Sequence, residues 1–198
     1  MMELDLVALH ERALEATLRT VAAVRPDQLS RPTPCPGLDV RAMIEHLVQG
    51  NFGFAKVAEG EPYLGGGGGS DAVADVVGHG VADDPAAALA ASAGRVAEAW
   101  RRPGVLDQMC RLPFGDMPGR FALALHLVEV LVHGWDVAKA TGLDTKLDPE
   151  LAGAALRTVE MAVTDDLRGP GGPFGPEVDV FEDAPVGDRL VAFLGRQP

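Results

Sequence analysis

Apolar side chains recur at helical spacing along most of this chain. Val7, Leu14, Leu18 and Val21 fall on one stripe within residues 5–24, which predicts a first helix. Similar patterns, bounded by helix start and stop signals, predict helices at residues 39–60, 84–102, 118–141 and 148–169, with a short one at 188–194. The sequence shows no alternating strand pattern of useful length, so the predicted fold class is all-α.

Start signals and loops divide the chain further. Asp39, Asp84 and Asp148 stand where a side-chain oxygen can cap a first helical turn, and prolines follow the last two. Residues 61–83 have no helical pattern and include five glycines at 65–69, which predicts a long flexible crossover. The chain is interpreted as one domain, residues 1–198, ending in a coil and short helix at 170–198.

The helix expected at residues 118–141 points to a function. It is almost wholly apolar, yet it carries His126, Glu129, His133 and Asp136 on one side. A histidine or carboxylate loses its hydration in an apolar interior, so these groups must pair with one another, meet water or hold an ion. Glu129 and His133 lie one turn apart, as helix-borne metal ligands often do. We therefore expect a metal site here.

A third ligand is expected from the second helix. His46 is interpreted as facing inward, and facing helices would bring it to Glu129 and His133. Two imidazoles and one carboxylate suit zinc, with nickel or another late first-row ion as alternatives, and three protein ligands leave a coordination position open. Asp136 is expected to orient a ligating imidazole, and His126 is a rival ligand. The alternative is a metal-free, hydrogen-bonded polar cluster.

Three other side chains have a structural and a functional interpretation. His10 is interpreted as a core histidine bonded to a neighbour, with a ligand or supporting role as the alternative. Cys35 follows the same logic: burial as a small hydrophobe in a proline-rich turn is favoured over a reactive or ligating thiol. Trp135 is expected to pack against a neighbouring helix rather than stack on a substrate.

Composition narrows the partners and the compartment. A net charge of −12 and a pI near 4.7 argue against a nucleic-acid partner, because phosphate binding needs clustered Lys and Arg. No uninterrupted apolar run approaches the roughly 20 residues of a membrane span, and the N-terminus has no secretory signal pattern. Two cysteines are too few for a disulfide scaffold. We expect a cytoplasmic protein that binds neither nucleic acid nor membranes.

Several motifs, in order and spread over nearly the whole chain, resemble a known family. They are TPCPG at 33–37, DVR at 39–41, EHLV at 45–48 with Asn51, LPFGD at 112–116, the segment 126–136, and FGPEV at 174–178. In these the sequence is similar to the DinB/YfiT-like helical bundles. Within them it resembles the actinobacterial branch related to the metal-binding N-terminal domain of mycothiol-dependent maleylpyruvate isomerase.

The resemblance implies a DinB-like four-helix bundle with a long crossover between helices 2 and 3 and additional C-terminal helical elements. It implies metal ligands at His46, Glu129 and His133, with supporting or substrate-pocket positions at His126, Asp136 and Asn51. Two departures stand out. Leu38 replaces an aromatic residue usual in the family, and the isomerase's C-terminal domain has no recognisable counterpart. Isomerase activity itself is therefore not carried over.

These observations predict a metal-dependent enzyme, a mycothiol-type thiol transferase or isomerase that acts on a small electrophile through an open metal coordination position. Its partners would be a small-molecule thiol and the electrophile, with a homodimer left open. The alternative is a non-catalytic metal- or ligand-binding module with a structural ion, which a fourth protein ligand such as His126 would favour. A third interpretation, a helical interaction protein, predicts exposed His46 and His133.

Overall fold

The computed structural model describes residues 5–63, 81, 84–169 and 173–198. They form α1 (Leu6–Ala22), η1 (Pro26–Gln28), α2 (Val40–Ala58), α4 (Pro85–Trp100), β1 (Met109–Leu112), β2 (Gly115–Pro118), α5 (Gly119–Thr141), α6 (Pro149–Ala162), η2 (Asp165–Leu167) and α7 (Val186–Phe193). The helices dominate, which confirms the all-α prediction. Most of the expected crossover at 61–83, including the glycines at 65–69, lies outside the described residues, as do residues 170–172 of the C-terminal coil.

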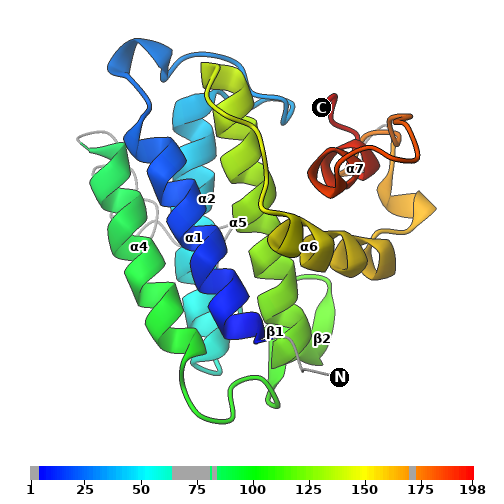
Figure 1. Ribbon diagram of the computed structural model, residues 1–198. Helices are drawn as coiled ribbons and strands as arrows, with labels where there is room; N and C mark the ends of the chain where they lie inside the picture. Colours follow the sequence, from blue (N-terminus) through cyan, green and yellow to red (C-terminus); the bar gives the residue numbers. More distant parts are fainter. Residues whose placement is uncertain (1–4, 64–80, 82–83, 170–172) are drawn as a thin grey trace.

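Four helices pack side by side as a bundle (Figure 1): α1, α2, α4 and α5. The central helix is α5, which contacts α1, α2 and α6, whereas α4 packs on α1 and α2. Outside this core, α6 packs on α5 and carries α7. The predicted four-helix bundle with additional C-terminal helical elements is confirmed.

The expected helix boundaries match within a few residues except at two places. The helix expected to reach residue 169 ends at Ala162, because Val163 adopts an extended backbone, and η2 follows as a separate turn. The sequence predicts an irregular stretch at residues 105–117 with one short extended piece around 109–113. In the structure β1 forms there and pairs with β2 as an antiparallel hairpin. Gly115 supplies a positive φ of 130° where the chain enters β2. Strands of four residues are too short to show alternation in a sequence.

The aspartate caps expected from the sequence are present. Asp39, Asp84 and Asp148 each accept a hydrogen bond from backbone N–H groups of the first turn, at distances between 2.9 and 3.2 Å. Each such cap stabilises its helix by about 1 kcal/mol. The caps therefore begin α2, α4 and α6 where the sequence placed them.

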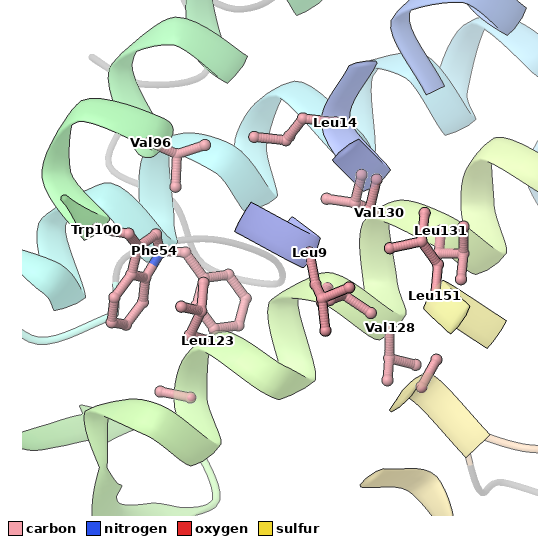
Figure 2. Close-up of a cluster of buried hydrophobic side chains, with 14 of the residues drawn as sticks. Leu9, Leu14, Phe54, Val96, Trp100, Leu123, Val128, Val130, Leu131 and Leu151 are labelled. Atoms are coloured by element: carbon pink, nitrogen blue, oxygen red, sulfur yellow. The ribbon is translucent and has the colours of Figure 1, made fainter. Parts of the chain in front are cut away.

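The central helix α5 is apolar because the core surrounds it. By length and composition alone it could cross a membrane, but 67% of its most apolar window is buried inside the protein. Fully burying one large apolar side chain contributes roughly 1.5–3 kcal/mol. Figure 2 shows the core side chains that meet around it: Leu9, Leu14, Phe54, Val96, Trp100, Leu123, Val128, Val130, Leu131 and Leu151.

A buried chain of hydrogen bonds crosses this core. Ser92 Oγ donates to the Leu89 carbonyl at 3.0 Å and accepts from Asn51 Nδ2 at 2.9 Å. Asn51 Oδ1 must then accept from His126 Nε2, 3.1 Å away. The neutral His126 ring keeps Nδ1 as an acceptor, to which His10 Nε2 donates over 2.9 Å. His10 is thus a core histidine bonded to a neighbour, as expected.

Burial keeps both of these imidazoles uncharged. It lowers the pKa of His10 to about 3, and burial together with the neighbouring His10 lowers the pKa of His126 well below 6.5. Below about pH 6.5 the unfolded chain protonates both histidines while the folded chain does not. The free energy of unfolding is therefore unaffected by this pair above that pH, and falls as the pH drops toward 3.

We expect this effect in urea unfolding followed between about pH 7.5 and 4.5, where each neutral histidine should remove about 1.4 kcal/mol of unfolding free energy per pH unit. His10→Leu removes one of the two groups, so the change in unfolding free energy with pH should become smaller by about 1.4 kcal/mol per pH unit. The control Leu9→Ala truncates the adjacent core position, which should lower stability at every pH without changing the slope. Equal slopes in wild type and His10→Leu would contradict the neutral assignment.

Candidate metal centre

Two of the three expected ligands, His46 and Glu129, meet where α2 faces α5, and the His133 ring lies beside that of His46. Among the described residues, the three whose ligand atoms all lie within 4.8 Å of one another are instead Cys35, His133 and Asp136. His46 Nε2 on α2 lies 3.3 Å from Glu129 Oε1 on α5. The rings of His46 and His133 stand edge to face with their centroids 5.0 Å apart. Packing of the two helices therefore unites residues that are more than 80 positions apart in the sequence. That these side chains hold a metal stays a prediction.

The cluster is partly open to solvent. The exposed fraction of the side chain is 34% for His46, 22% for Glu129 and 15% for His133. His46 was expected to face inward, but on an ideal helix it is rotated by about 60° from Met43 and about 100° from Leu47, the buried neighbours. It consequently lies at the margin of the apolar face. Such partial burial suits a centre that must admit a small molecule.

The spacing of His46 and Glu129 is compatible with a shared cation. Two ligands of one tetrahedral zinc ion, each about 2.0–2.1 Å from it, lie roughly 3.3 Å apart, as His46 Nε2 and Glu129 Oε1 do at 3.3 Å. Gly50, one turn after His46, makes room for the carboxylate, because a Cβ there would lie 2.7 Å from Glu129 Oε1. The Glu129 carboxylate, which accepts a hydrogen bond from the His46 ring, raises the pKa of His46, so a proton and a metal ion would compete for the same place.

Asp136 lies beside His133, where it can orient the ring. Its Oδ2 is 2.9 Å from His133 Nδ1, and the carboxylate is fully buried. A proton on Nδ1 leaves the His133 Nε2 lone pair for a ligand. Arg196 also binds Asp136, donating from Nε at 2.9 Å and Nη2 at 2.8 Å. Burial acts to raise the Asp136 pKa, but the hydrogen bonds from His133 and Arg196 outweigh burial and hold it below its usual value.

The expected supporting residues His126 and Asn51 are bonded to each other instead. Both ring nitrogens of His126 are engaged, by His10 and by Asn51. His126 therefore offers no lone pair to an ion as placed in the structure, and the idea of His126 as a rival or fourth ligand is not supported by its geometry. A supporting or substrate-pocket role for His126 and Asn51 stays a prediction.

Cys35 lies closer to the cluster than its structural interpretation implied. It is half-buried, and its Sγ and single ligand atoms of His133 and Asp136 all lie within 4.8 Å of one another. Burial raises the pKa of the thiol, so it is a neutral thiol at pH 7. Asp136 already accepts three hydrogen bonds, two from Arg196 and one from His133, whereas the Cys35 thiol and Nε2 of His133 have no hydrogen-bond partner among the described residues. The Cys35 thiol is therefore a candidate for a fourth donor.

Tyr63 also borders the cluster, and no sequence pattern marked it. Its ring packs on α2, where Gly53 makes room: a Cβ there would lie 2.6 Å from the ring. Phe54 meets the ring edge to face, with centroids 5.2 Å apart. Burial, and then the negative charge of Glu129, raise the Tyr63 pKa, so the phenol keeps its proton.

Trp135, as expected, is buried in the bundle.

Two surface hollows lie away from these donors. One of about 320 Å³ is lined by residues that include Trp100 and Arg101, and one of about 410 Å³ by residues that include Leu9 and Met161. In the described part of the chain neither hollow is lined by a member of the donor cluster. The assignment of a centre therefore depends on the chemistry and spacing of the donors rather than on cavity size.

Comparison with known proteins gives a consistent set of matches. The sequence model of the mycothiol maleylpyruvate isomerase N-terminal domain matches residues 10–138. Two uncharacterized proteins from two strains of Mycobacterium tuberculosis are each 36% identical over 195 residues, covering 98% of both chains. The crystal structure of the mycothiol-dependent maleylpyruvate isomerase has a TM-score of 0.66 at 16% identity, covering 82% of this chain and 70% of that one. A histidine mutant of that enzyme gives 0.65 at 14% identity, with the same coverage of both chains.

The glycine beside Glu129 offers a direct test of the centre. Gly50→Ala should displace the Glu129 carboxylate and lower zinc affinity about 10-fold or more, since ligand placement matters at this scale. Alanine also favours helix by about 0.5–1 kcal/mol, so lost affinity should not be accompanied by unfolding. The control Gly94→Ala, on α4 with no atom near its Cβ among the described residues, should leave affinity unchanged. Zinc competition with a chromophoric chelator measures both, and unchanged affinity in Gly50→Ala would contradict the geometry.

Proposed function

Because the chain belongs to the family of the mycothiol maleylpyruvate isomerase N-terminal domain, we propose that it binds a divalent metal ion and acts with a small thiol on an electrophile. The ligands proposed are His46, Glu129 and His133, and the ion proposed is zinc. The observation that carries the proposal is the 3.3 Å approach of His46 to Glu129 from facing helices, with the His133 ring beside them. The proposed location is the cytoplasm.

Each side chain has a distinct role in this proposal. His46 and Glu129 hold the ion from opposite helices, and Gly50 keeps the carboxylate within reach. His133 presents Nε2 because Asp136 accepts the proton on Nδ1. The partial exposure of the three ligands leaves a side from which a small molecule can approach. Three ligands rather than four are what a reactive centre needs.

The chemistry proposed is nucleophilic attack by a thiolate. A bound divalent ion lowers the pKa of a coordinated thiol and so supplies a thiolate at neutral pH. We propose a thiol of the mycothiol type, because the solved enzyme with this fold is mycothiol-dependent by name. A thiolate that adds to an electrophile and stays gives a transferase, and one that adds and leaves again gives an isomerase. Maleylpyruvate itself is not part of the proposal, since the match covers 70% of the isomerase chain.

A second candidate function is a non-catalytic metal-binding module with a structural ion. One observation favours it: Cys35 Sγ lies within 4.8 Å of ligand atoms of His133 and Asp136. A thiol that joined the three proposed ligands would close the coordination sphere, and closed tetrahedral sites are structural. The two candidates therefore differ in whether an added thiol can reach the ion.

We expect untagged protein purified without chelator to take up zinc stoichiometrically. His46→Ala and Glu129→Gln should each weaken binding by about 100-fold or more, because losing a ligand costs more than losing an outer partner. The control Glu59→Gln changes a partly buried carboxylate that pairs with Arg95 at the end of α2, and this variant should bind zinc as wild type does. Metal analysis and chelator competition measure these affinities. Absence of uptake by the wild-type protein would overturn the metal assignment.

Access to the ion can be measured with cobalt in place of zinc. A thiol added to the Co²⁺ protein should produce sulfur-to-cobalt charge-transfer absorption if a coordination position is open. Cys35→Ser should show the same thiol-induced band, and Cys110→Ser, a buried cysteine on β1, serves as the matched control. A charge-transfer band that is present without added thiol and is lost only in Cys35→Ser would favour the structural ion instead.

A further inference from the structure

The end of the chain returns to the central helix. Arg196, two residues before the C-terminus, places its guanidinium on Asp136 of α5 with two donor atoms, Nε to Oδ1 at 2.9 Å and Nη2 to Oδ2 at 2.8 Å. A third donor, Nη1, binds the Leu194 carbonyl at 3.2 Å. The Asp136 side chain is fully buried and that of Arg196 is only 10% exposed. This is a two-point contact out of water, not a surface ion pair.

The same carboxylate also binds one of the proposed ligands. Asp136 Oδ2 lies 2.9 Å from His133 Nδ1 and 2.8 Å from Arg196 Nη2. The planar guanidinium of Arg196 binds both oxygens of the Asp136 carboxylate, so the carboxylate cannot rotate and the direction of its remaining lone pairs is fixed. The orientation of the His133 ring, and the choice of Nδ1 as its protonated nitrogen, follow from that direction.

Without the arginine the carboxylate would lose this restraint. A buried charge with a missing partner recruits water or moves, and the cost is large enough to reorganise its surroundings. The helix α5 holds the backbone of His133 in place, but the direction of the His133 ring depends on its hydrogen bond to Asp136. A continuous series of contacts thus links Arg196 in the C-terminal tail, through the Asp136 carboxylate, to the His133 imidazole.

We propose that Arg196 is a positioning residue of the metal centre, which acts through Asp136 to fix the ring and tautomer of His133. The inference rests on the proposed function, since it assigns a purpose to an imidazole that the proposal treats as a ligand. Arg196 lies beyond residues 10–138, the part of the chain that the family's domain model matches. The C-terminal segment is accordingly a working part of the centre and not only a cover for the bundle.

A second arginine distinguishes positioning from simple docking of the tail. Arg168 holds the same C-terminal segment: its Nη1 donates to the Phe193 carbonyl at 2.6 Å, and its guanidinium lies 4.4 Å from the centre of the Phe193 ring. Its recorded partners are in the tail, whereas Arg196 reaches Asp136. Arg168→Met should therefore loosen the tail without altering His133 directly.

The first measurement needs no metal. Nitrogen-15 NMR of the histidine side chains in the metal-free protein reports which ring nitrogen carries the proton. In wild type and Arg168→Met, His133 should be protonated at Nδ1. In Arg196→Met the ring should shift toward the Nε2 tautomer or show a mixture. If His133 keeps the Nδ1 tautomer unchanged in Arg196→Met, the inference is overturned, whatever the fate of the metal proposal.

The second measurement is zinc affinity by chelator competition. Arg196→Met should bind about 10–100-fold more weakly, the usual effect of losing an outer partner of a ligand, while Arg168→Met should change by less than about 3-fold. Adding Arg196→Met to Asp136→Asn should cause no further loss of zinc affinity, because both substitutions act on His133 through the same carboxylate. Equal losses in Arg168→Met and Arg196→Met, or additive losses in the double variant, would assign the arginine to tail docking alone.

Arg196→Lys covers the case in which Arg196→Met does not fold. Lysine keeps the positive charge that the buried carboxylate needs, but a single ammonium cannot grip both oxygens as the fork does. Affinity between that of wild type and that of Asp136→Asn supports the inference, and affinity equal to wild type overturns it. If wild type itself binds no zinc, the proposed function fails, while the tautomer measurement still decides the role of Arg196.

Discussion

An ionisable side chain inside an apolar bundle needs a partner, and this constraint governs the whole structure because the central helix carries four of them. Each is satisfied in a different way. His126 stays neutral and is bonded on both sides, and Asp136 stays charged against Arg196. Glu129 and His133 lie near the edge, where both are partly exposed to water, Glu129 faces His46, and His133 is bonded to Asp136. These polar residues of α5 therefore divide into a buried, satisfied set and a partly exposed set that contains the proposed ligands.

The buried polar residues hold in place the helices that carry the partly exposed ones. His126 and Asn51 tie α5 to α2 and α4 from inside the core, which fixes the spacing of the two helices that carry the proposed ligands. Asp136 then sets the direction of one ligand, and Gly50 leaves the space into which another reaches. Ligands that are already held in place bind a cation more tightly than ligands that must first be ordered, and this is the advantage that the proposed centre would gain from the buried set.

Most of the fold could be predicted from the sequence because helices depend on local information. Apolar spacing and aspartate caps located every α-helix described, though not the 3-10 turns η1 and η2, and the motifs 126–136 and 45–48 pointed to the family to which the chain belongs. The early end of α6 and the hairpin β1–β2 could not be predicted, since an extended Val163 and four-residue strands leave no periodic trace.

For the candidate centre, the sequence by itself determined which side chains could ligate, because Glu129 and His133 share a helix face and His46 stands on a second helix. Only the tertiary structure decided that His126 turns to His10, that Cys35 and Tyr63 lie near the ligands, and that Arg196 reaches Asp136. The physical reason is that helical periodicity is a property of neighbours along the chain. A contact between α5 and a residue 60 positions away depends on how packed helices and tails meet, which no local pattern encodes.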